Sequence, residues 1–273
     1  MNSDIGMYGI PYNISPHGMK IVEYFGLENV IVTEPDDRFS RYKHYILGFT
    51  NRSGSNYLAE MIAGDARYSP ARESLCADMV IEKSKEHGFK RFSDYLFWLV
   101  ESTTEHGHAF GAKASFGQLS WLAATGVFEN CFPQARIIHM KRENVVAQAL
   151  SLSIARQTKQ WMSTQKSKIN SDDISYNPVE INRFVKEIVR SNAEFEGFFL
   201  KHSIDPVEVS YEDFCNNTEQ ELGNIYRALG FFNIGLTLNI NGSKLLKQAG
   251  TINQSFEDRF KQENRIGNIS NKY

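Results

Sequence analysis

The chain has 273 residues and a formal net charge of −2 at pH 7, from 30 lysines and arginines against 32 aspartates and glutamates. This near balance excludes the strongly basic surface of a dedicated nucleic-acid-binding protein. A hydrophobic content of 41% with only 7 prolines excludes a chain that is disordered throughout and predicts a globular protein.

The cysteines and the apolar runs indicate the compartment. Three cysteines, an odd number at wide spacing, form neither a disulfide framework nor a zinc-binding pattern, which favours a reducing environment. No apolar run approaches the roughly 18 residues that a transmembrane helix needs. Residues 1–20 also lack the basic and apolar regions of a secretory signal. We therefore expect a cytoplasmic protein without a transmembrane segment.

Residues 1–43 differ in composition from the rest of the chain. They are rich in Gly, Pro, Tyr and Asn and show no sustained periodicity. We interpret them as an N-terminal extension that lies on the core, followed by one α/β domain over residues 44–273. Three roles for the extension stay open: it could cover a binding cleft, add an edge strand to the sheet, or mediate dimerisation.

From residue 45 onward, short apolar runs alternate with segments of helical periodicity, as in a parallel sheet covered by helices. The expected strands are residues 45–49, 110–115, 135–140 and 207–209. The expected helices are residues 56–63, 92–105, 145–154, 179–201 and 222–229, with one more around residues 119–122. This order predicts a single domain with a P-loop-like central parallel β-sheet flanked by helices and a helical elaboration. The polar stretch of residues 162–177 is expected to be a mobile connection.

The loop after the first expected strand has the composition of an anion site. It contains Arg52, Ser53, Gly54, Ser55 and Asn56, directly before a helix. At such a position the free N–H groups and the dipole of the helix favour an anion, and arginine binds phosphate groups in a bidentate way. An ordinary turn in which Ser53 or Ser55 caps the helix is the alternative interpretation.

This loop is not a Walker A motif. That motif, G-x-x-x-x-G-K-[ST], needs a lysine for the β- and γ-phosphates, and the loop contains none. The sequence therefore disfavours a conventional ATPase or GTPase.

The loop and several later segments resemble the bacterial carbohydrate sulfotransferases of the trehalose 2-sulfotransferase type, in which the loop reads like R-S-G-S-T. The other similar segments are residues 111–113, 132–139, 148–152, 155–158 with Trp161, 211–213, and 247–249 with Asn253, Phe256 and Arg259. The similarity covers roughly residues 45–262 and leaves the N-terminal extension without a counterpart. It implies 3′-phosphoadenosine 5′-phosphosulfate as the donor, held at its 5′-phosphosulfate by residues 52–56, and no metal.

The resemblance also implies a site for the 3′-phosphate of the donor, at Arg142 and Ser151. Arg142 follows an expected strand and precedes a helix, where charge and dipole both favour a dianion. The two residues are one position further apart than is usual in the family, and Glu143, which would restore the spacing, would repel a phosphate. Either the turn absorbs the extra residue or Lys141 shares the role. A mid-helix serine that bonds its own turn is the alternative for Ser151.

Sulfuryl transfer to a hydroxyl needs a base, and the resemblance implies Glu73 for this role. The family segment is similar to G-x-P-x-E, and here one extra residue separates Pro70 from Glu73. The alternative is that Glu73 stabilises a helix N-terminus. His106 and His108 are the next candidates for the base, and they lack the third ligand of a metal site.

Two further residues are candidates for ligand contacts. Lys113 is expected near the carboxyl end of its strand, where ligands bind in open α/β sheets. Trp161 ends the helix that carries Ser151 and is a candidate platform for a sugar ring at the acceptor entrance.

Together these features predict sulfuryl transfer from 3′-phosphoadenosine 5′-phosphosulfate to a hydroxyl of a carbohydrate or glycolipid, with Arg52 and Glu73 as catalytic residues. Two alternatives remain: a P-loop phosphotransferase, and a nucleotide-binding sensor or scaffold that keeps the donor site without catalysis. The acceptor, the sulfated position and the oligomeric state, a homodimer among the options, stay open.

Overall fold

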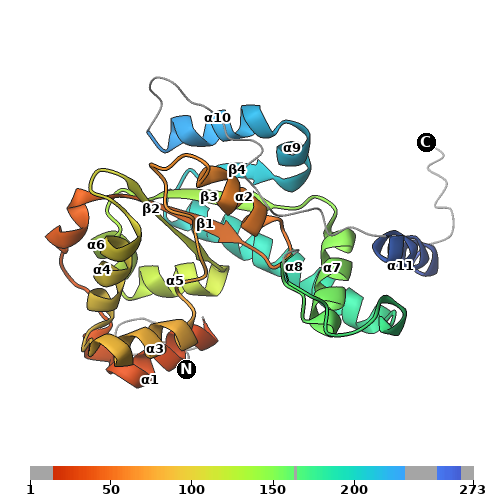
Figure 1. Ribbon diagram of the computed structural model, residues 1–273, viewed down its shortest axis with the longest axis horizontal. Coiled ribbons are helices and arrows are strands. Elements are labelled where there is room, and N and C mark those ends of the chain that lie inside the picture. The colour runs from red at the N-terminus through yellow and green to blue at the C-terminus, as the bar shows by residue number, and fades with distance from the viewer. Residues whose placement is uncertain (1–14, 163–164, 231–250, 266–273) are drawn as a thin grey trace.

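Four parallel strands form the centre of the computed structural model, which describes residues 15–162, 165–230 and 251–265 (Figure 1). The strands are β1 (Lys43–Phe49), β2 (Ala109–Ala114), β3 (Arg136–Lys141) and β4 (Val207–Ser210). Their order in the sheet is β2-β1-β3-β4, and each neighbouring pair is parallel. The predicted central parallel sheet is therefore confirmed, at the strands that the apolar runs indicated.

Helices cover both faces of the sheet, which explains why the strands read as nearly continuous apolar runs. Ile46 faces one core, whereas its neighbours Tyr45 and Leu47 face the other. The first core includes residues of α1 (Pro16–Phe25), α3 (Ala77–His87), α4 (Phe92–Thr103) and α5 (Phe116–Ala124). The second includes residues of α2 (Ser55–Ile62), α9 (Tyr211–Asn216) and α10 (Thr218–Ala228). Figure 1 shows α10 on one side of the sheet and α1, α3 and α5 on the other.

The register brings the carboxyl ends of the strands to one edge. Leu47 of β1 pairs with Lys113 of β2, and Phe49 pairs with Met140 of β3. The loops that follow β1, β2 and β3 therefore leave the sheet side by side. In open α/β sheets this is the edge at which ligands bind.

An irregular segment extends the sheet beyond β2. Tyr68 forms an isolated parallel bridge with Ala109, and Arg72 forms another with Ala112. Residues 68–72 therefore run alongside β2 in the same direction. As a result, Glu73 reaches the same edge of the sheet as the ends of β1 and β2.

Three helices form an elaboration with its own apolar cluster. They are α7 (Val145–Thr158), α8 (Pro178–Lys201) and α11 (Thr251–Glu263). Leu150, Phe184 and Phe260, one from each helix, are buried together. Lys247, Gln248 and Ala249, which carry part of the family resemblance, lie outside the described residues. Within the described ranges, no helix combines the length and apolar character needed to cross a membrane.

Part of the predicted N-terminal extension packs into the first core. Helix α1 begins at Pro16 after Ser15, whose side chain accepts a hydrogen bond from the backbone N–H of Gly18. Ile21 and Phe39 are almost fully buried. The division of the chain at residue 43 stays a prediction.

Candidate active site

The loop between β1 and α2 has a backbone that only certain residues adopt. Arg52 and Gly54 both have positive φ angles, 66° and 96°. Two features exclude a side chain at Gly54. Its φ is in the left-handed region, and a Cβ would collide with the ring of Tyr211. Glycine at this position therefore lets the backbone pass directly beneath Tyr211.

Helix α2 begins at this loop without a side-chain cap. Gly54 is its N-cap, and within the described part of the chain no side chain caps the backbone N–H groups of its first turn. Ser53 is fully buried, and its hydroxyl has no hydrogen-bond partner among the described residues. A buried hydroxyl without a partner costs about 1–3 kcal/mol. The capping turn proposed above as an alternative is therefore not what forms here, and the site retains unused donors for an anion.

A buried glutamine of α7 holds the loop in place. The Nε2 of Gln148 donates to Thr50 Oγ1 and to the backbone oxygen of Asn51, both at 2.8 Å. Gln148 is fully buried. The loop and helix α7 are therefore fixed relative to each other, although 97 positions separate Asn51 from Gln148 in the chain.

Arg52 bonds to the middle of α7 and to the segment that follows this helix. Its Nε donates to Ser151 Oγ at 3.0 Å, and its Nη1 donates to the backbone oxygen of Trp161 at 2.5 Å. Among the described residues, Ser151 therefore bonds the arginine of the loop rather than its own helical turn. Burial lowers the pKa of Arg52, and the nearby charge of Arg142 acts in the same direction. Two guanidinium groups that repel each other in a partly buried space favour an anion between them.

Arg142 lies on an aromatic ring next to the loop. Its guanidinium carbon is 4.9 Å from the centre of the Tyr211 ring, and its Nε is 3.9 Å from Glu212 Oε1. The carboxylate of Glu212 accepts hydrogen bonds from the backbone N–H groups of Glu143 and Asn144, at 3.0 and 3.3 Å. Glu212 therefore stabilises the turn between β3 and α7, which holds Arg142 at the strand end.

The structure shows how α7 begins between Arg142 and Ser151, and which residues Lys141, the other candidate cation, contacts. Asn144 is the N-cap of α7, and its Oδ1 accepts from the N–H of Ala147 at 2.9 Å. Lys141 pairs instead with Glu208 of β4 and with Glu196 of α8, at 2.9 and 3.5 Å. Lys141 is thus paired with carboxylates of β4 and α8, whereas Arg142 contacts the ring of Tyr211 next to the loop.

Glu73 is paired with a buried lysine. The Nζ of Lys113 donates to Glu73 Oε1 at 2.8 Å and to Asn56 Oδ1 at 2.5 Å. Lys113 is 2% exposed, and its ammonium lies 4.2 Å from the centre of the Phe49 ring. Burial lowers the pKa of Lys113, and the charge of Glu73 opposes this shift. Glu73 itself precedes α3, whose N-cap is Cys76, so the alternative role as a helix N-terminal residue finds no support.

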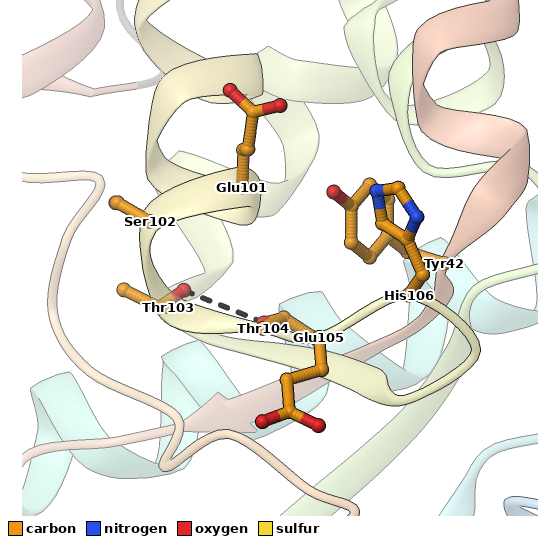
Figure 2. A pocket seen from close by; sticks show the side chains of 7 residues that line it. All are labelled: Tyr42, Glu101, Ser102, Thr103, Thr104, Glu105 and His106. Carbon is orange, nitrogen blue, oxygen red and sulfur yellow. Dashed lines mark hydrogen bonds between the residues drawn. The ribbon is translucent and has the colours of Figure 1, made fainter.

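The structure does not bring His106 to this edge of the sheet. His106 precedes β2 and lines a pocket of about 500 Å³ at the amino ends of the strands (Figure 2). Its ring lies 5.3 Å from that of Tyr42, which precedes β1. The other residues that line the pocket are Glu101, Ser102, Thr103, Thr104 and Glu105. Arg52 and Lys113 lie at the carboxyl ends of the strands, whereas His106 lies at the amino ends. His106 is therefore too remote from the site of Arg52 and Lys113 to act there as the base for an acceptor hydroxyl.

The backbone of Trp161 is hydrogen bonded, and its side chain is exposed to solvent. Its carbonyl oxygen accepts the hydrogen bond from Arg52, whereas its side chain is 41% exposed. An aromatic ring in this position is available to a molecule that approaches Arg52 from solvent. Its place at an acceptor entrance stays a prediction.

The chain is similar to known sulfotransferases. A family model described as Stf0 sulphotransferase matches residues 115–263, which is more than half of the chain and includes Arg142 and Ser151. The sulfotransferase domain from the Synechococcus PCC 7002 olefin synthase is 16% identical, with a TM-score of 0.47, over 87% of this chain and 91% of that one. No curated protein matches the sequence.

Proposed function

Because the chain belongs to the Stf0 sulphotransferase family, we propose that it transfers a sulfuryl group from 3′-phosphoadenosine 5′-phosphosulfate to a hydroxyl of a carbohydrate or glycolipid. The observation that carries this proposal is the uncapped start of α2, where the buried hydroxyl of Ser53 has no partner among the described residues. Arg52 and Arg142 place positive charge beside it. The resemblance to the trehalose 2-sulfotransferase type supports a carbohydrate acceptor.

The donor would lie across the loop and the start of α7. In this arrangement, Arg52, Ser53, Gly54, Ser55 and Asn56 bind the 5′-phosphosulfate. Arg142 and Ser151 bind the 3′-phosphate. Arg52 contacts Ser151, so the two proposed phosphate sites are adjacent. Binding of the donor would then exchange this side-chain hydrogen bond for contacts with phosphate oxygens.

The proposed reaction is a displacement at sulfur. The acceptor oxygen attacks the sulfur in line with the leaving group, and its proton passes to the Glu73 carboxylate. A bond forms between the acceptor oxygen and sulfur as the bond from sulfur to the 5′-phosphate oxygen breaks. The electron pair of that bond leaves with the phosphate, where Arg52 and the N–H groups at the start of α2 stabilise the charge.

Calorimetric titration tests the donor site directly. The ligands are adenosine 3′,5′-bisphosphate, AMP and ATP, and the proteins are wild type, Arg142→Ala and Arg136→Ala. Arg136 is exposed at the opposite end of the same strand and serves as the matched control. We expect the bisphosphate to bind at least about tenfold more tightly than AMP, a difference of about 1.4 kcal/mol. Only Arg142→Ala should abolish this preference.

Other outcomes would favour the two alternatives. Equal binding of all three nucleotides would overturn the donor assignment, and a requirement for magnesium with ATP would favour a phosphotransferase. Tight binding of the bisphosphate without transfer from labelled donor to any sugar or glycolipid, and without donor hydrolysis, would favour a sensor or scaffold.

A further inference from the structure

A buried lysine at the end of β2 holds Glu73 in two ways. The ammonium of Lys113 donates to the Glu73 carboxylate at 2.8 Å, and the backbone N–H of Lys113 donates to the oxygen of Arg72 at 2.8 Å. Both the side chain and the backbone of the segment that carries Glu73 are therefore fixed to β2. The side chain of Glu73 remains 58% exposed, so a fixed carboxylate still faces solvent.

The same ammonium also reaches the anion loop. Its hydrogen bond to Asn56 Oδ1 is 2.5 Å long, and Asn56 lies in the first turn of α2. Burying an ammonium is costly unless opposite charge and hydrogen bonds compensate it. Here the Glu73 carboxylate, the Asn56 amide and the face of the Phe49 ring provide that compensation. A residue that only filled space at this position would need neither the charge nor the two polar contacts.

We propose that Lys113 is a positioning residue, which holds the Glu73 carboxylate at a fixed distance from the loop that binds the donor. This inference rests on the proposed function and adds a part to it. A base accelerates proton transfer only when it lies within hydrogen-bond reach of the acceptor hydroxyl. Lys113 fixes this geometry, because it contacts the base and the first turn of α2 with one ammonium group.

A neighbouring cation offers a matched control. Arg72 precedes Glu73 directly, but its guanidinium pairs with Glu60 at 2.8 Å, and its side chain is 61% exposed. Pairs as exposed as this one contribute little. Arg72→Met therefore removes a positive charge from the same segment without removing the contact to the Glu73 carboxylate.

The test is a double-mutant cycle on kcat, with Lys113→Met, Glu73→Gln and the double variant at saturating donor. Loss of a general base costs about 10²–10⁴-fold, and we expect Lys113→Met alone to cost at least about tenfold. In the Glu73→Gln background, the same change should cost less than about threefold, since it acts through a base that is already absent. Arg72→Met should leave kcat close to wild type.

A second measurement separates an effect on the base from an effect on the donor loop or on folding. Lys113→Met and Lys113→Gln should bind adenosine 3′,5′-bisphosphate within about threefold of wild type, which requires a folded donor site. Additive effects in the cycle, or a tenfold loss of bisphosphate affinity in both Lys113 variants, would overturn the proposal. If wild type itself neither transfers sulfate nor prefers the bisphosphate, the proposed function fails and this inference fails with it. An active wild type with an additive cycle overturns this inference alone.

Discussion

The ring of Tyr211 contacts Arg142 and also lies close to the backbone of Gly54. The guanidinium carbon of Arg142 is 4.9 Å from the ring centre, and a Cβ on Gly54 would collide with the same ring. Tyr211 therefore sets the distance between the cation proposed for the 3′-phosphate and the loop proposed for the 5′-phosphosulfate.

Replacing this ring should weaken donor binding. Tyr211→Ala removes the cation–π contact, which is worth about 0.5–2 kcal/mol, and opens the space beside Arg142. Tyr211→Phe keeps the ring and removes a hydroxyl that is neutral near pH 7, since an ordinary tyrosine pKa is about 10 and burial raises the pKa of Tyr211 further, to about 12. We expect calorimetry with adenosine 3′,5′-bisphosphate to show a loss of about 2- to 30-fold for Tyr211→Ala and none for Tyr211→Phe. Equal losses in both variants would assign the effect to the hydroxyl.

Gly54→Ala should abolish donor binding and destabilise the protein. The substitution strains a backbone with a φ of 96° and drives a methyl group into the Tyr211 ring. Gly88→Ala is the matched control, because Gly88 also has a positive φ, 71°, but an added Cβ meets no atom within 4 Å. Backbone strain alone costs about 1–3 kcal/mol, so chemical denaturation should show a larger loss for Gly54→Ala than for Gly88→Ala. A Gly54→Ala variant that binds the bisphosphate normally would contradict the loop assignment.

Ser53→Ala should weaken ligand binding without destabilising the protein. The Ser53 hydroxyl is buried without a hydrogen-bond partner among the described residues. Removing it should leave the free energy of unfolding unchanged or raise it by up to about 1 kcal/mol. Donor binding should lose the hydrogen bond to a charged group, about 1.5–3 kcal/mol. Thermal unfolding with and without the bisphosphate measures both effects, and a destabilised free protein would show that Ser53 already has a structural partner.

The sheet and its loop were predictable from sequence because their signals are local. An apolar run such as residues 45–49, followed by a small polar loop and a helical pattern, predicts a strand, a turn and a helix wherever it occurs. Helix α3 was missed because only Ala77, Val80 and Ser84 are buried along it, and charged residues fill most other positions. Helix α1 was missed because it lies in a segment whose composition suggested an irregular extension.

The contacts within the site were not predictable in the same way. Arg52 and Ser151 are 99 positions apart, and Glu73 and Lys113 are 40 apart. Such pairs depend on the order and register of the strands, because these determine which loops lie at the same edge of the sheet. No local sequence pattern encodes strand order or register. The sequence placed Lys113 near a strand end, and that position was the one available signal for its contact with Glu73.

Two buried histidines should make the protein sensitive to mild acid. Burial lowers the pKa of His44 and that of His139 to about 4, from an ordinary value of 6.5. Well above pH 6.5 both groups are neutral in the folded and unfolded chains and add no pH dependence. As the pH falls below 6.5, only the unfolded chain takes up the protons, so the free energy of unfolding decreases. The decrease approaches about 3 kcal/mol per histidine near pH 4.

Urea denaturation at pH 7.5 and pH 5.0 measures this decrease in the free energy of unfolding. His139 packs against Phe195 and Phe199, and both of its ring nitrogens lack hydrogen-bond partners in the described part of the chain. His139→Leu should therefore reduce the loss between the two pH values by about 1–2 kcal/mol. His202→Gln, at an exposed position, should leave it unchanged. If His139→Leu and wild type lose the same stability on acidification, His139 takes up its proton in the folded protein, and its surroundings must open to solvent more readily than the packing of the two phenylalanine rings allows.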